Sequence, residues 1–123
     1  PTNWSSGTVP GVGDTVFLDG INTYTVTLTG AASVDAIFIG GTSGQQGLSL
    51  SSATLTLAGN IEMSANGGLT LTSSTINGSG DLINNGGLTT NSNNTINLNV
   101  VNHGLHTWNG FTNTMNGKTT TNI

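Results

Sequence analysis

The sequence predicts an all-β protein folded as a single-stranded β-solenoid of four to five coils. The dipeptide Gly-Leu recurs at intervals of about 20 residues, which is typical of a solenoid in which each repeat forms one coil. Each copy opens a stretch of alternating apolar and polar residues, the pattern of a half-buried strand. The copies are Gly47-Leu48-Ser49-Leu50, Gly68-Leu69-Thr70-Leu71, Gly87-Leu88-Thr89-Thr90 and Gly104-Leu105-His106-Thr107, and their spacings are 21, 19 and 17 residues.

Two further strand-like segments recur with the same period, so each coil is expected to hold three strands of three to five residues. One follows Thr54 and the other follows Asn60. Because side chains alternate between the two faces of a strand, every second residue should point into a triangular core. The predicted core residues are Leu48, Leu50, Leu69, Leu71 and Leu88 in the first column, Leu55, Leu57, Ile76, Ile96 and Leu98 in the second, and Ile61, Met63 and Leu82 in the third.

Asparagine and glycine recur at the expected corners. Asn66-Gly67, Asn85-Gly86 and Asn102-His103 each precede a Gly-Leu strand. Both residue types suit tight turns, because Asn tolerates a left-handed backbone and Gly favours it. Asn66, Asn85 and Asn102 are therefore candidates for a stacked corner column whose side chains hydrogen-bond along the solenoid. Plain turn chemistry without such a ladder explains the pairs equally well.

Threonine pairs at alternate positions raise the possibility of an ice-binding face. Thr54-x-Thr56 and Thr70-x-Thr72 are two examples. By the Gly-Leu alignment, however, the column Ser49, Thr70 and Thr89 ends in His106. That interruption argues against a regular rank, and exposed Thr is common on strands in any case.

The charge content excludes several classes of partner. Only 5% of residues are charged, the net charge is −4, and Lys118 is the sole base. Nucleic acids and anionic membrane surfaces both require Lys and Arg clusters, so neither is expected as a partner. No apolar run approaches the 18 residues of a spanning helix, and membrane insertion is not expected. There is no cysteine.

No constellation of residues predicts catalysis, a cofactor or a metal. Asp14 and Asp19 flank one predicted strand, and the other acidic residues lie on different coils. His103 and His106 are three residues apart, which places them on opposite faces of a strand unless a corner separates them. These residues are interpreted as turn and surface positions, and the chain is expected to be non-enzymatic with no cofactor.

The first forty residues differ from the repeats. Asn3-Trp4 leads to Val9-Pro10-Gly11 and then to Gly13-Asp14-Thr15-Val16, with a turn expected at Pro10 and Gly11. This opening, followed by Gly/Thr/Asn/Leu coils, resembles the β-helical stretches of bacterial surface adhesins of the autotransporter-like type. The resemblance implies a secreted, structural or adhesive role and supplies no catalytic residues. The expected organisation is one domain: a cap and first coil over residues 1–40, regular coils over 41–107, and a C-terminal strand and tail over 108–123.

The ends of the predicted solenoid carry the functional expectation. No helix or charged segment covers the last coil, and charges that would discourage edge pairing are scarce. We therefore expect an extracellular, bacterial cell-surface fibre built by head-to-tail stacking or strand exchange of identical units. The candidate contact residues are Trp4, Trp108, Phe111 and Ile123. A module of a long adhesin is one alternative, and an ice-binding or carbohydrate-binding solenoid, with cell-surface glycans as partners, is another.

Overall fold

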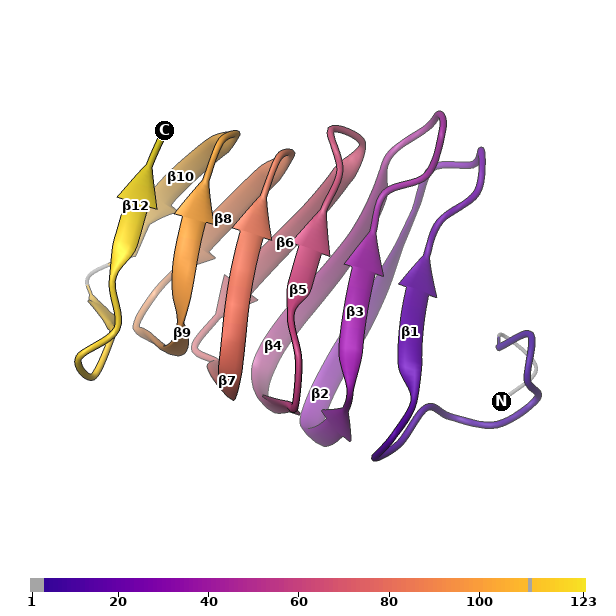
Figure 1. Cartoon of the computed structure of the whole chain (residues 1–123), viewed down its shortest axis with the longest axis horizontal. Helices are drawn as coiled ribbons and strands as arrows, with labels where there is room; N and C mark the ends of the chain where they lie inside the picture. Colours follow the sequence, from indigo (N-terminus) through magenta and orange to yellow (C-terminus); the bar gives the residue numbers. More distant parts are fainter. Residues whose placement is uncertain (1–3, 111) are drawn as a thin grey trace.

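A computed structural model describes residues 4–110 and 112–123, and these form twelve strands and no helix (Figure 1). Phe111, one of the predicted contact residues, lies outside the described residues. The strands are β1 (Thr15–Leu18), β2 (Tyr24–Val34), β3 (Ala36–Ile39), β4 (Gln46–Leu57), β5 (Ile61–Met63), β6 (Gly67–Thr72), β7 (Thr75–Asn84), β8 (Gly87–Asn91), β9 (Asn94–Asn102), β10 (Leu105–Asn109), β11 (Asn113–Thr114) and β12 (Thr120–Asn122).

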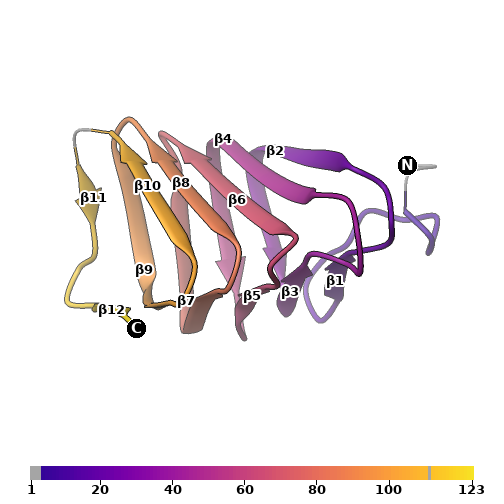
Figure 2. The same cartoon turned by 90° about the horizontal axis from the view of Figure 1, so that it is seen from above.

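The strands stack as the predicted solenoid of about five turns, and every pairing between them is parallel (Figure 2). Three faces surround one core. The first face holds β1, β3, β5, the C-terminal parts of β7 and β9, and β12. The second face holds the N-terminal parts of β2 and β4, with β6, β8 and β10. The third face holds the C-terminal parts of β2 and β4, the N-terminal parts of β7 and β9, and β11.

Strands run through some corners instead of stopping at them, so they are longer than the predicted three to five residues. β4, with twelve residues, bends from the second face to the third at Ser52. The φ angle of Ser52 is +49°. Ser73 and Ser92 lie at the same corner in later coils, with φ angles of +49° and +59°. A single left-handed residue turns the chain there, and the parallel pairing resumes beyond the corner at Thr54 and Thr75.

The core matches the sequence prediction. The thirteen residues predicted to point inward are all buried. They form one continuous apolar column that also includes Val16, Leu18, Ile37 and Ile39 from the first coils. Burial of this column is the main stabilising contribution available to a chain with so few ionic groups.

The alignment of the fourth Gly-Leu copy is wrong by one residue. Leu105 lies in register with Gly87, and His106 lies in register with Leu88. The third copy has two glycines after its corner, Gly86 and Gly87, whereas the fourth has only Gly104. Since the backbone N–H of Leu105 bonds to the carbonyl of Gly86, Leu105 takes the place of Gly87. The side chain of Leu105 is consequently 66% exposed.

The candidate functional site at the two ends

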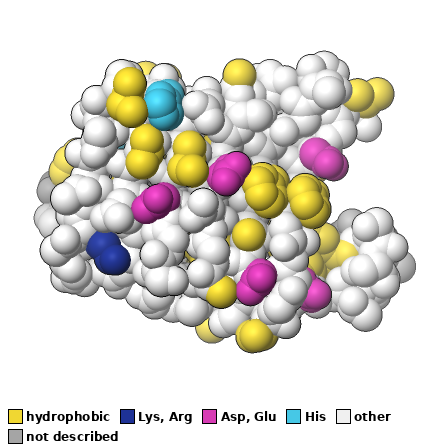
Figure 3. All heavy atoms as spheres, viewed as in Figure 1, with side chains coloured by type: hydrophobic (Ala, Val, Ile, Leu, Met, Phe, Trp, Pro, Cys, Tyr) yellow, Lys and Arg dark blue, Asp and Glu magenta, His cyan; other side chains and the backbone are white. Residues whose placement is uncertain are grey.

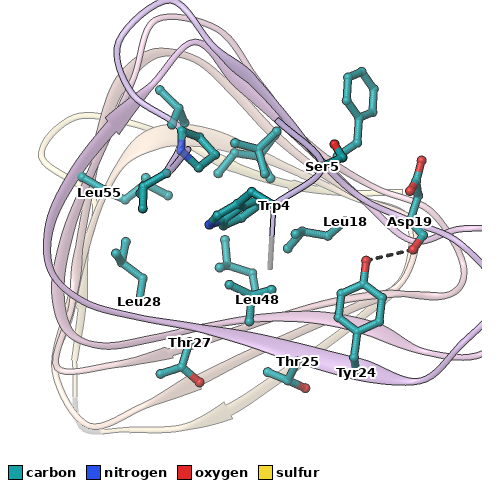
Figure 4. A pocket seen from close by; sticks show the side chains of 18 residues that line it. Trp4, Ser5, Leu18, Asp19, Tyr24, Thr25, Thr27, Leu28, Leu48 and Leu55 are labelled. Carbon is teal, nitrogen blue, oxygen red and sulfur yellow. Dashed lines mark hydrogen bonds between the residues drawn. The ribbon is translucent and has the colours of Figure 1, made fainter. Parts of the chain in front are cut away.

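The N-terminal end of the core is partly closed by Trp4. Its indole packs against the buried core, at the centre of the triangle formed by the three faces (Figure 4). The turn at Pro10 and Gly11 that leads into β1 is present. Asp14 donates its backbone N–H to the carbonyl of Gly11 at 3.0 Å, and its carboxylate accepts the N–H of Gly11 at 2.8 Å. Trp4 therefore lies over the N-terminal end of the core.

A cavity of about 840 Å³ remains between the N-terminal segment and the first coil. Its lining is mostly apolar and includes Trp4, Val16, Leu18, Val26, Leu28 and Leu48. Tyr24 lies at its rim, where the hydroxyl donates to the backbone carbonyl of Asp19 at 2.8 Å. Burial, together with the nearby Asp19 carboxylate, raises the pKa of Tyr24. A mostly apolar space of this size, with Asp19 as its one acidic lining residue, is suited to receive apolar side chains.

The C-terminal end carries two rings on the inward side of the last coil, a half-buried His106 and an exposed Trp108. His106 continues the core column of Leu48, Leu69 and Leu88, and Trp108 continues that of Leu50, Leu71 and Thr90. The two ring planes are within 8° of parallel, with centroids 6.4 Å apart. Trp108 is 56% exposed, and within the described residues no strand pairs with the outer edge of β10. Burial lowers the pKa of His106.

Strand edges at this end carry no charge. Within β10, β11 and β12 there is no Asp, Glu, Lys or Arg, and Ile123, beyond β12, is 77% exposed. Such an edge presents unpaired backbone N–H and C=O groups that another parallel coil can bind. Trp4 and the group of Trp108 and Ile123 therefore lie at opposite ends, and contact between them requires two molecules.

The predicted corner column of Asn66, Asn85 and Asn102 does not form. Asn102 is instead in register with Asn84 and Asn122. Met63 and Asn84 are in register, and so are Gly68 and Gly87, but four residues separate Met63 from Gly68 and only two separate Asn84 from Gly87. Asn-Gly pairs that look alike in the sequence therefore occupy different positions in this corner. Asn66 donates to the carbonyl of Gly41 at 2.9 Å.

Side-chain amide ladders form at other positions in the last coils. In the inward-facing column of the first face, the buried Nδ2 of Asn84 donates to Asn102 at 2.6 Å, and that of Asn102 donates to the exposed Asn122 at 3.1 Å. On the outer surface, Asn116 donates to Asn97 at 2.8 Å, and Asn97 donates to Asn77 at 2.7 Å. A search for Asn at coil spacing, instead of for Asn-Gly pairs, would have found both.

The two ends carry opposite charges at one corner. Asp14 is equivalent to Asp35 one coil later, because Asp35 donates its N–H to the carbonyl of Asp14. Lys118 lies at this same corner in the last coil, just before β12, as Asp14 lies just before β1. The molecule therefore has a carboxylate at one end of the corner and an ammonium at the other. Elsewhere charges are sparse and separate (Figure 3).

The described residues provide no metal cluster. Among residues 4–110 and 112–123, no group of three or more His, Cys, Asp and Glu side chains is placed to hold an ion. Nor does this part of the chain hold a helix of the length and apolarity needed to cross a membrane. Comparison with protein-family models, with curated proteins and with solved structures gave no match.

Proposed function

We propose that this chain is a non-enzymatic structural protein of the bacterial cell surface, a length of rigid β-solenoid that joins end to end with further copies to build an extracellular fibre. The observation that carries the proposal is the complementarity of its two ends. One end holds an apolar cavity lined by Trp4, and the other exposes Trp108 and Ile123. A contact between different surfaces of identical units extends indefinitely unless it closes into a ring.

Charge supports the same head-to-tail direction. In a continued stack, Lys118 of one copy would approach Asp14 of the next, since both occupy the same corner. An ion pair at a partly exposed site contributes little affinity, but it favours one orientation over others. The edge strands β10, β11 and β12 carry no Asp, Glu, Lys or Arg that would repel a neighbouring coil.

Association in solution tests this proposal. Sedimentation velocity of the purified chain should show mass that grows with concentration without a plateau. Trp108→Ala should remain monomeric at concentrations where the wild type assembles, and it should fold normally because the ring is largely exposed. Lys118→Glu should weaken assembly, most clearly at low salt. A wild-type chain that stays monomeric throughout would refute assembly from identical copies.

A second candidate is a segment of a long surface adhesin, in which the next coil comes from a different sequence. One column favours it. In a stack of identical copies, the amide ladder that ends at Asn122 would meet Leu18, which belongs to the apolar core of the first coil. A following coil with another Asn would continue the ladder instead. A monomeric wild type in the sedimentation experiment would favour this candidate.

A further inference from the structure

Three glycines stack on the outer surface of the second face. Gly47, Gly68 and Gly87 are in register on β4, β6 and β8. Each precedes a buried leucine of the core column, so each occupies an outward position. Glycine is disfavoured inside strands because it has no side chain to pack and loses more entropy on folding. Its recurrence in three successive strands calls for a physical reason.

The fold supplies a steric reason only at Gly47, where an added Cβ would lie 3.1 Å from the Oγ1 of Thr25. None of the three has a positive φ. A Cβ added at Gly87 would meet no atom within 4 Å, and at Gly68 the nearest atom would be the carbonyl oxygen of Gly87 at 3.8 Å. The preceding residue, Gly86, is different, because a Cβ there would overlap the carbonyl oxygen of Gly67. Gly86 is required by the corner, whereas Gly68 and Gly87 are not.

Gly47 and Gly68 form the floor of a shallow groove on the second face, and Gly87 continues the same column by one coil. A surface depression of about 210 Å³ lies over Gly47 and Gly68, bordered by Thr25, Gln45 and Thr70. Along one side runs a column of hydroxyl groups, one per coil. The correct register completes this column, because Thr107 and not His106 follows Thr89; its members are Thr27, Ser49, Thr70, Thr89 and Thr107.

We propose that this groove binds an extended, uncharged polysaccharide chain aligned with the solenoid axis. The described strands of the second face contain no Asp, Glu, Lys or Arg, which matches a neutral ligand and offers no cation to an anionic glycan or lipid headgroup. The hydroxyl column offers one donor and acceptor every 4.8 Å or so, close to the repeat of sugar rings in an extended β-linked chain. Leu105 continues the glycine column and gives an apolar contact for a ring face.

An ordered ice surface fits the same face less well. Ice binding by a solenoid requires parallel, uniform ranks of hydroxyl groups. The next outward column, two residues further along each strand, begins with the hydroxyl groups of Ser51 and Thr72 but continues with the amides of Asn91 and Asn109. Those two amides bond to each other, with the Nδ2 of Asn109 donating to Asn91 at 3.2 Å. One hydroxyl column beside a groove suits a single chain better than a lattice plane.

Calorimetric titration with cellohexaose and chitohexaose, and co-sedimentation with insoluble cellulose and chitin, test the proposal. The wild type should bind at least one of these neutral glycans. Gly68→Val/Gly87→Val should fill the groove and weaken binding by at least about tenfold, while the thermal midpoint stays equal or rises. Thr70→Val/Thr89→Val removes two hydroxyls without changing shape and should also weaken binding. Thr75→Val, on the third face, is the matched control and should bind as the wild type does.

Two results would overturn the inference. One is a wild type that binds none of the four glycans, or that loses no affinity in either double variant. The other is inhibition of ice recrystallisation by the wild type that is lost in Thr70→Val/Thr89→Val without any glycan binding. That second result would assign the face to ice. Neither result bears on end-to-end assembly, which uses different residues.

Discussion

Asn84 is a buried amide in a column that earlier coils fill with Leu18, Ile39 and Met63. Its side chain is fully buried and makes three hydrogen bonds: it donates to Asn102 and to the carbonyl of Leu105, and it accepts the N–H of Gly86. Polar atoms of this kind stabilise a core only while every partner is satisfied.

Asn84→Ala should therefore lower the free energy of unfolding by about 2–4 kcal/mol, because it opens a cavity and leaves those partners unpaired. Asn109→Ala is the matched control. It removes one hydrogen bond between side-chain amides, from Asn109 to Asn91, at an exposed position. The free energy of unfolding should fall by about 0.5 kcal/mol or less. Urea denaturation of both variants measures the difference. Equal losses would show that the buried ladder does not stabilise the last coils.

His106 should make stability depend on pH. Burial lowers its pKa in the folded chain below the ordinary value of 6.5. The unfolded chain therefore takes up a proton more readily, and the free energy of unfolding falls as pH decreases from 6.5 to the folded pKa. The stability that comes from burying the neutral His106 ring is fully present above pH 6.5. His106→Gln should flatten this part of the profile when unfolding is measured across that range. An unchanged slope would contradict the placement of the ring.

Gly86 and Gly87 are neighbours in the chain, but the corner has no room for a side chain at Gly86, whereas the strand has room for one at Gly87. Gly86→Ala should lower the free energy of unfolding by at least about 2 kcal/mol, because the methyl group would overlap backbone carbonyls of Gly67 and Ser64. Gly87→Ala should change it by no more than about 0.5 kcal/mol, since the methyl group meets nothing. Thermal unfolding followed by circular dichroism compares the pair. Similar losses in both would contradict the corner geometry.

The strands were predictable from the sequence to a useful degree, because the period of about 20 and the alternation within each strand both come from burial of one core. All three predicted core columns are buried. The corners were less predictable. The fourth Gly-Leu copy has one glycine fewer than the third, which moves its register by one residue. The corner that contains Asn85 is two residues shorter than the corner that contains Asn66, so the two asparagines do not stack. Corner length changes without altering the hydrophobic pattern, so the pattern does not report it.

For the whole molecule, closure of the N-terminal end by Trp4 has a measurable effect. Trp4→Ala should lower the free energy of unfolding by about 1–3 kcal/mol, because it removes apolar burial from the open end of the core. Val12 lies in the same segment and is 88% exposed, so Val12→Ala should change the free energy of unfolding by no more than about 0.5 kcal/mol. Guanidinium denaturation measures both. A Trp4 variant as stable as the Val12 variant would mean that the indole does not close the core.

The candidate site was partly predictable for the same reason that the core was. Trp4 precedes the repeats and Trp108 follows the last Gly-Leu copy, so their positions in the chain were enough to place both at the ends. The cavity beside Trp4, the equivalent corner positions of Asp14 and Lys118, and the glycine groove depend on register between distant coils. A local pattern does not contain that information.

Electron microscopy of the purified chain at neutral pH tests end-to-end assembly most directly. We expect unbranched fibres one solenoid wide, with an axial repeat of about 25–30 Å set by the stacked coils and the N-terminal segment, and no fibres from Trp108→Ala. Isolated particles that persist at high concentration would contradict assembly from identical copies.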